Sequence, residues 1–159
     1  MADHVLQTRQ WLARPRPDVF AVVADPANIA RLAPPAFRVR LLTPGVTLTA
    51  GAVLDFELRW LGVPMAWRTF VREWDPPYRF VTVQVRGPYA RWEHRHRLLE
   101  EGAGTWLEDR VTYGLPLGPL GRLAQALLVG PQIQAAWAWR RERLAELLVP
   151  VSAPAAGSG

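Results

Sequence analysis

Residues 89–99, YARWEHRHRLL, and residues 105–115, TWLEDRVTYGL, decide the fold, because each alternates between two kinds of side chain. Successive side chains of a β-strand point to opposite faces of a sheet, so this period of two predicts two neighbouring strands. The arginine-rich parity of the first stretch is expected to face water, because a row of charges cannot be buried without partners. The inward side chains are then Trp92, His94, His96 and Leu98 on one strand and Leu107, Asp109, Val111 and Tyr113 on the next.

The segments around this pair extend it into a larger antiparallel sheet. Turns of hairpin length that contain glycine or proline separate consecutive segments, which favours a meander. In residues 53–60 every second side chain is apolar and shares one face, whereas Met65 to Trp74 has aromatic residues on both parities, so its inward face is left open. The further strands are predicted at His4 to Leu12, Phe37 to Leu41, residues 53–60, Met65 to Trp74 and Arg79 to Val85.

Two short helices are predicted after the first strand and one long helix after the last. The first covers Asp18 to Ala24, and the second starts at Asp25-Pro26, where proline suits a first helical turn. Gly130-Pro131 is expected to kink or split the long helix, because proline removes a ladder hydrogen bond. Apolar residues at helical spacing define this helix: Leu120, Leu123, Leu127, Ile133, Trp137, Leu144 and Leu148. The order of elements predicts an α+β fold, with about six to seven antiparallel strands and the long helix on one face of a curved sheet.

Length and composition restrict the classes of protein. The 159 residues fit a single domain, expected over residues 1–149, and the tail at 150–159, PVSAPAAGSG, is expected to be disordered. Cysteine is absent, so no disulfide or thiolate metal site is possible. The first residues carry no basic stretch followed by an apolar run, so no secretory signal is expected, and the most apolar window, Leu117 to Val129, is too short to span a membrane. A cytoplasmic protein without stable membrane insertion is expected.

The net charge of +5 does not indicate nucleic acid as the partner. All 19 basic residues are arginine, and 14 acidic residues are available to pair with them. Arginine binds carboxylates as readily as phosphates. The outward residues Arg91, Arg95 and Arg97 are therefore interpreted as a solvated face that pairs with Glu93 and Glu108.

The inward polar residues His94, His96, Asp109 and Tyr113 admit several interpretations. They can form an internal network in which Asp109 fixes a histidine tautomer, or they can orient a mostly apolar ligand in a cavity. His94 or His96 can also act as a general acid or base oriented by Asp109, since imidazole titrates near neutrality. A metal site is disfavoured, because only one inward carboxylate accompanies the two imidazoles. No glycine-rich phosphate loop or nucleophilic serine motif is present, and no cofactor is expected.

Tryptophan is unusually frequent, with eight residues against three tyrosines. Trp60, Trp67 and Trp92 lie on predicted strands, where ordinary core packing is one role. The alternative is a cavity wall, because large rigid rings on a concave sheet leave gaps that a ligand can occupy.

A series of motifs runs through the last two predicted strands, the neighbouring turns and the opening helices. In the strands and turns they are Gly87-Pro88-Tyr89, Trp92-x-His94-x-His96, Gly104-Thr105 and Asp109-x-Val111-x-Tyr113-x-x-Pro116-x-Gly118, and in the helices Val19-Phe20, Asp25, Asn28, Leu32 and Pro34-Pro35. Together they resemble the bacterial SRPBCC proteins of the START/Bet v 1-like superfamily, in the subgroup of polyketide cyclase and ligand-binding domains. The resemblance extends from Val5 to Leu148.

This resemblance implies a helix-grip fold, in which a curved antiparallel sheet wraps around a long C-terminal helix and encloses a hydrophobic cavity. It implies binding of a small hydrophobic molecule that is a lipid, a polyketide or a quinone-like compound. The alternative is an enzyme of the polyketide cyclase or dehydratase type that uses His94 or His96 as general acid or base.

Two positions depart from the family pattern. Thr82 stands where the family often has an acid after the phenylalanine at Phe80, which weakens any catalytic pair with Gln84. The late helix reads Trp137-x-Trp139-Arg140 where the family often has Phe-x-Tyr-Arg, which enlarges the side chains on the helix that lines the cavity.

We therefore predict a domain, monomeric or homodimeric, that binds a small hydrophobic ligand without a metal or cofactor. Whether it also catalyses a reaction is left open, with His94, His96 and Asp109 as the catalytic candidates. The residues predicted to contact the ligand are Phe56, Leu58, Trp60, Trp67, Gln84, Trp92, His94, His96, Asp109, Tyr113 and Trp137.

Overall fold

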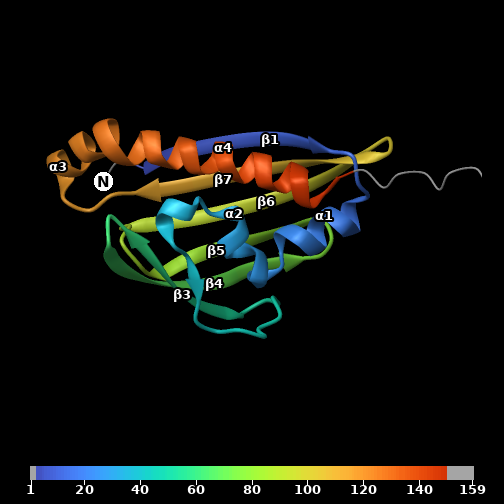
Figure 1. The fold of residues 1–159 in the computed structure, drawn as a ribbon, viewed down its shortest axis with the longest axis horizontal. Helices are drawn as coiled ribbons and strands as arrows, with labels where there is room; N and C mark the ends of the chain where they lie inside the picture. The colour runs from blue at the N-terminus through green and yellow to red at the C-terminus, as the bar shows by residue number, and fades with distance from the viewer. Residues whose placement is uncertain (1–2, 150–159) are drawn as a thin grey trace, which may run out of the picture.

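A seven-stranded antiparallel sheet forms the body of the computed structural model, which describes residues 3–149. The strand order is β1-β7-β6-β5-β4-β3-β2, so β2 to β7 follow one another as a meander and β1 pairs with β7 at the edge (Figure 1). This confirms the predicted antiparallel meander. The strands are β1 (Asp3–Leu12), β2 (Arg40–Leu41), β3 (Val53–Trp60), β4 (Val63–Asp75), β5 (Arg79–Arg86), β6 (Arg91–Glu101) and β7 (Gly104–Gly114).

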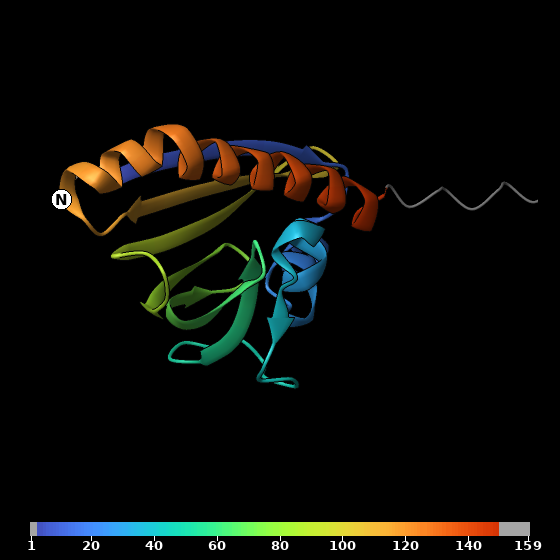
Figure 2. The ribbon, with the colours of Figure 1, turned by 60° about the vertical axis from the view of Figure 1, so that its left-hand side comes forward.

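Helices cover one face and one end of the curved sheet, as the predicted α+β helix-grip fold requires. In Figure 2 the C-terminal helix lies along β1 and β7, the sheet curls away from it towards β3, and α1 and α2 close one end. The predicted tail at 150–159 lies outside the described residues. The helical elements are α1 (Arg16–Val23), η1 (Pro26–Asn28), α2 (Ile29–Leu32), η2 (Pro35–Phe37), α3 (Gly118–Ala124), the π-helical η3 (Gln125–Val129) and α4 (Gly130–Leu147).

A two-residue turn joins β3 to β4. Trp60 pairs with Val63, and the turn residues Leu61 and Gly62 have φ angles of 49° and 81°. Two positive φ values are typical of a type I′ turn, whose twist matches that of the paired strands. The predicted hairpin is confirmed.

A bulge in β4 explains why its inward face could not be predicted from the sequence pattern. The pairing of β4 with β5 shifts register between Val71 and Glu73. A bulge adds one residue to a strand and so reverses which parity faces inward beyond it. Trp67 therefore faces inward from an odd position and Trp74 from an even one, where its ring lies 5.7 Å from that of Phe80.

The strand predicted from Phe37 to Leu41 is much shorter than expected. Pro35–Phe37 forms a 3-10 turn, and Arg38 has a left-handed backbone with a φ of 43°. Extended pairing therefore begins only at Arg40 and ends at Leu41. The alternating pattern was misleading here because a turn directly after two prolines interrupts the extended chain.

The long helix continues through Gly130-Pro131 because the turn before the proline widens. The Gly130 N–H donates to the carbonyl of Gln125, five residues earlier instead of four. This π-helical register accommodates the proline ring without breaking the helix. Glycine is favoured at 130, since a Cβ there would lie 2.9 Å from the Gln125 carbonyl oxygen. The expected kink or split is thus a local change of helical register.

The apolar residues of the long helix do not all face the sheet. Ile133 and Leu144 are buried, as predicted. Leu120 and Leu123 are 69% and 58% exposed, because α3 reaches past the tips of β6 and β7 (Figure 1). Leu127 on η3 is 65% exposed, so the predicted single apolar face is contradicted. No helix within residues 3–149 is long and apolar enough to cross a membrane.

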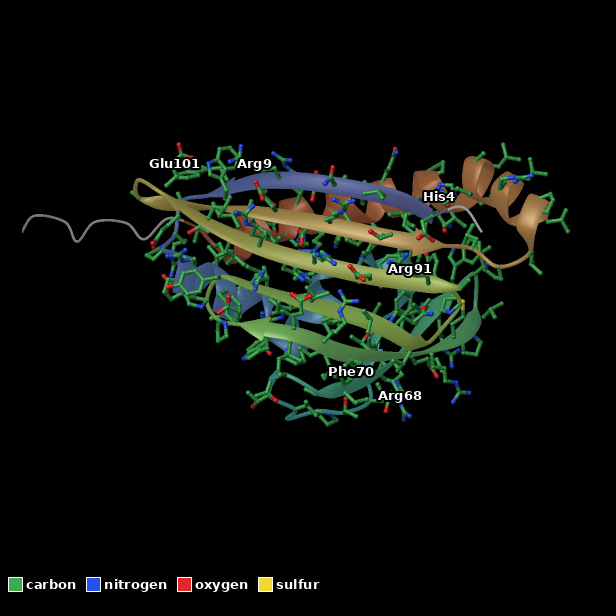
Figure 3. All side chains as sticks on the ribbon, turned by 180° about the vertical axis from the view of Figure 1, so that it is seen from behind. His4, Arg9, Arg68, Phe70, Arg91 and Glu101 are labelled. Atoms are coloured by element: carbon green, nitrogen blue, oxygen red, sulfur yellow. The ribbon has the colours of Figure 1, made fainter. Side chains whose placement is uncertain are left out.

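The convex face of the sheet carries the predicted paired charges, and Figure 3 shows arginine side chains along it. Glu93 lies among them and is only 6% exposed, because its carboxylate accepts from Arg95 at 2.6 Å and from Arg72 at 2.8 Å. Burial alone would raise the pKa of Glu93, but these two hydrogen bonds outweigh it and the net shift is downward. Glu108 lies at 3.2 Å from Arg9 and is one-third exposed.

Replacing Glu93→Gln should lower the free energy of unfolding by about 1–3 kcal/mol, because two arginines lose their shared charged acceptor while the side-chain size is kept. The matched change Glu108→Gln should cost less than about 1 kcal/mol, since its ion pairs are more exposed. Urea denaturation at pH 7 measures both values. An equal or larger loss for Glu108→Gln would contradict a structural role for the buried carboxylate.

Candidate functional site

A cavity of about 500 Å³ lies between the concave face of the sheet and the C-terminal helix. The strands β3 to β6 form one side, and residues of α1, α2 and α4 form the other. Eight of the predicted contact residues line it, namely Phe56, Leu58, Trp60, Trp67, Trp92, His94, His96 and Trp137. Apolar residues that the sequence reasoning did not select line it as well, among them Ile29, Leu32, Leu54, Met65, Phe80 and Ile133.

Three predicted contact residues lie behind the cavity wall. Gln84 turns towards the β5–β6 connection, where its Nε2 donates to the carbonyl of Tyr89 at 2.7 Å. Tyr113 is 4% exposed, and its hydroxyl accepts from Gln125 Nε2 at 2.6 Å. Asp109 lines a smaller crevice of about 260 Å³ between β1 and α4. In this structure these side chains support the wall instead of forming it.

Aromatic rings that pack against one another form much of the cavity wall. The ring of Trp92 lies 5.2 Å from Trp67 and 4.7 Å from Tyr89 on the sheet side, and 6.1 Å from Trp137 on α4. Phe56 stacks on Trp67 at 5.6 Å. Rings that brace one another in this way leave a rigid space between sheet and helix, because none can rotate into it without losing its neighbours.

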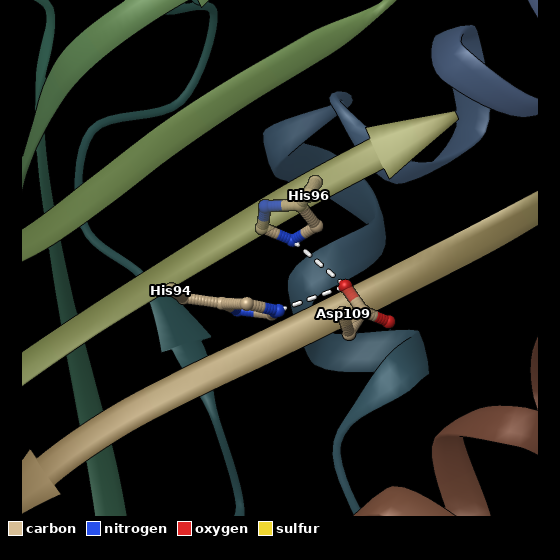
Figure 4. Close-up of side chains that lie close together, drawn as sticks. All are labelled: His94, His96 and Asp109. Carbon is tan, nitrogen blue, oxygen red and sulfur yellow. Dashed lines mark hydrogen bonds and ion pairs between the residues drawn. The ribbon is translucent and has the colours of Figure 1, made fainter. Parts of the chain in front are cut away.

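The paired strands β6 and β7 bring two imidazoles and one carboxylate together, with the imidazoles on the cavity wall and the carboxylate behind it. His94 Nε2 lies 2.9 Å and His96 Nε2 3.6 Å from the same Asp109 oxygen, Oδ1. Figure 4 shows both rings turned towards that carboxylate. His96 faces Asp109 directly across the two strands and stacks on Phe80 with ring centroids 4.0 Å apart. The predicted inward cluster is therefore present.

Arg140 belongs to this cluster, and the sequence reasoning gave it no role. It is 8% exposed, and its Nη2 lies 3.5 Å from Asp109 Oδ1. The spacing of Arg140 in the sequence could have identified it, since it follows Trp137 by three residues and precedes Leu144 by four. This spacing places Arg140 on the inward face of α4. An arginine on a helix is usually read as a surface residue, and only the buried carboxylate opposite explains this one.

Charge partners keep Asp109 ionised in the interior. Burial alone would raise the pKa of Asp109, but the charge of Arg140 and the hydrogen bond from His94 outweigh it, and the net shift is downward. An ionised carboxylate only accepts hydrogen bonds. We therefore assign the hydrogen of this contact to His94 Nε2.

Both histidines are held neutral. Burial lowers the pKa of His94, and Asp109 offsets this only in part. Burial and the neighbouring His94 lower the pKa of His96 well below its usual value. A neutral His94 that donates through Nε2 carries its free lone pair on Nδ1, which makes it an available base.

The cluster also has the ligand types of a metal site, since potential ligand atoms of His94, His96 and Asp109 lie within 4.8 Å of one another. The guanidinium of Arg140 lies at 3.5 Å from the only carboxylate of this set. Its positive charge opposes a cation at that position. The residues present therefore fit an internal charge pair better than a metal.

Residues 12–136 match a family model described as polyketide cyclase / dehydrase and lipid transport. No curated protein matches the sequence significantly.

Many solved structures share the fold. The protein TTHA0849 from Thermus thermophilus superposes with a TM-score of 0.74 at 19% identity, over 92% of this chain and 97% of that one. The Zhui aromatase/cyclase from Streptomyces sp. R1128 gives 0.73 at 15% identity, over 91% and 93%. A START superfamily protein from Mycobacterium smegmatis gives 0.67 at 16% identity, over 91% and 99%. At these identities the similarity establishes the fold alone.

Lowering the pH from 7 to 5 should reduce the free energy of unfolding. The pKa values of His94 and His96 are lower in the folded chain than the usual 6.5, so below pH 6.5 the unfolded chain binds protons that the folded chain does not. The stabilisation is complete above the unfolded pKa and decreases by at most about 1.4 kcal/mol per pH unit for each histidine. Urea denaturation at stepped pH values measures this slope.

The variants His94→Gln and His96→Gln should each make the slope shallower between pH 6.5 and 5. A slope that neither substitution changes would show that these imidazoles are not buried in the neutral form.

Proposed function

The chain belongs to the polyketide cyclase / dehydrase and lipid transport family, and we propose that it binds a small hydrophobic molecule in the cavity between the sheet and α4. The cavity itself carries this proposal, since its volume of about 500 Å³ falls within the usual range for ligand pockets. Such pockets are mainly apolar and contain a few polar groups that fix the orientation of the ligand.

The proposed ligand is a lipid, a polyketide or a quinone-like molecule. Its affinity comes mainly from apolar burial against rings such as Trp67, Trp92 and Trp137, at about 25 cal/mol for each Å² removed from water. His94 and His96 orient the polar part of the ligand. All residues that line the cavity belong to one chain, so a monomer suffices for binding.

Filling the cavity should weaken binding without removing any polar contact. Ala136 lines the cavity on α4, so Ala136→Phe should weaken the binding of dodecan-1-ol at least tenfold by occupying its space. The preceding residue, Ala135, is exposed, so Ala135→Phe serves as the matched control and should bind as the unmodified protein does. Quenching of tryptophan fluorescence measures both affinities.

A specific contact favours a second candidate, catalysis of the cyclase or dehydratase type with His94 as general base. The hydrogen bond between His94 Nε2 and Asp109 fixes the tautomer and leaves Nδ1 free, while His94 lines the cavity. Such a base removes a proton from carbon next to a carbonyl group, a common step of condensation chemistry. His96 is less suitable, because it is 6% exposed and stacked on Phe80.

If His94 acts as a base, the protein should accelerate exchange of the C2 hydrogens of 1-tetralone with deuterium. His94→Gln should then reduce the protein-dependent rate by about 100-fold or more, and His96→Gln by much less. Proton NMR in D₂O measures the exchange. Equal rates for the two variants would leave binding as the supported function.

A further inference from the structure

Four side-chain donors on α4 are buried without an acceptor within residues 3–149, and they belong to Trp137, Trp139, Arg140 and Arg143. Trp139 and Arg143 pack on each other, with the guanidinium carbon 4.5 Å from the ring centroid, whereas Trp137 and Arg140 line the main cavity. Arg140 is 8% exposed, and its Nη1 atom is buried without a hydrogen-bond partner within residues 3–149. Trp137 lies one turn earlier on the same helix, and its Nε1 is likewise buried with no partner in the described part of the chain. Buried polar groups are almost always paired in folded proteins. Two such donors on residues that line the cavity therefore indicate an acceptor that comes from outside the chain.

Both side chains reach the spaces that a ligand can occupy. Arg140 and Trp137 line the main cavity and also the smaller crevice behind it, so they stand at the wall that the two spaces share. A molecule whose apolar body fills the main cavity can therefore place one end at this wall.

The charge of Arg140 is only partly used inside the protein. Its Nη2 lies 3.5 Å from Asp109 Oδ1, which is longer than the 2.7–2.9 Å of a charge-assisted hydrogen bond. The same Asp109 oxygen already faces His94 Nε2 at 2.9 Å. A guanidinium has five N–H donors, so Arg140 keeps donors for a second acceptor.

We propose that the bound molecule carries a carboxylate, and that Arg140 Nη1 and Trp137 Nε1 donate hydrogen bonds to its oxygens. This inference rests on the proposed binding function and names the chemical class of its ligand: an apolar body with one carboxylate head.

Other head groups fit these donors less well. A cationic head group would be repelled by the positive charge of Arg140. A hydroxyl head group has a single neutral oxygen to accept from two donors. A phosphate dianion calls for more positive charge than the one cationic side chain that lines the cavity among the described residues. A carboxylate has two oxygens and one charge, which match one guanidinium N–H and one indole N–H.

The test compares dodecanoate with dodecan-1-ol, which share a chain and differ in the head. Isothermal titration calorimetry at pH 8, below the micellar concentration of the acid, gives both dissociation constants. The unmodified protein should bind dodecanoate at least tenfold more tightly than the alcohol, as expected for a charge-assisted hydrogen bond in a buried site. The double variant Arg140→Met, Asp109→Asn, which removes both charges of the internal pair, should reduce this ratio to about one.

Trp137→Phe provides the second variant, because it removes only the indole N–H and keeps a ring. It should lower the ratio of affinities severalfold, mainly by weakening dodecanoate. The matched change Trp92→Phe on the opposite wall should weaken both probes by a similar factor and keep the ratio. If the double variant does not fold, the comparison of Trp137→Phe with Trp92→Phe tests the carboxylate assignment by itself.

The outcomes separate this inference from the proposed function. Equal affinities of the unmodified protein for acid and alcohol overturn the carboxylate assignment and leave ligand binding intact. A preference for the acid that survives both Arg140→Met, Asp109→Asn and Trp137→Phe also overturns it. Binding of neither probe overturns the proposed cavity function itself, and the carboxylate inference with it.

Discussion

The buried carboxylate of Asp109 is the constraint on which the interior of this protein depends. A charge taken out of water costs several kcal/mol unless it is paired and hydrogen-bonded. Asp109 satisfies this requirement from two directions, with His94 on the neighbouring strand at 2.9 Å and Arg140 on α4 at 3.5 Å. The ion pair between Asp109 and Arg140 therefore links the sheet to the helix across the core.

Arg140 lies on the same face of α4 as the buried residues Ile133 and Leu144. With Arg140 directed at Asp109, the helix also turns Ile133 and Trp137 towards the sheet, because these positions share one face. The opposing sheet presents large rings that are braced against one another, and such rings cannot close the remaining space. An apolar cavity with one charged wall is the result, which is the combination that recognises an apolar molecule by its polar end.

The alternation of side chains was enough to predict much of this arrangement from the sequence. It placed His94, His96 and Asp109 on the inward face, because a period of two leaves a strand only two choices and the arginines exclude one of them. It did not identify the inward face of β4, since the register shift after Val71 reverses the parity within that strand.

Other features depend on tertiary context that no local pattern contains. Arg140 has the spacing of a core position but the chemistry of a surface residue, and the carboxylate that explains it lies 31 positions earlier in the chain. Leu120 and Leu123 have helical spacing, yet they are exposed, because α3 extends beyond the sheet that would have covered them. The periodicity of the sequence thus predicted which side chains could be buried. The tertiary arrangement of the helices and strands determined which of them are buried.

The central claim, that the interior holds a small hydrophobic molecule, is tested most directly by native mass spectrometry of protein purified without organic solvent. Retention of a ligand predicts a second species, heavier than the bare chain by the mass of one small molecule and lost in the Ala136→Phe variant. Bare chain as the sole species, together with no uptake of added hydrophobic compounds, would contradict it.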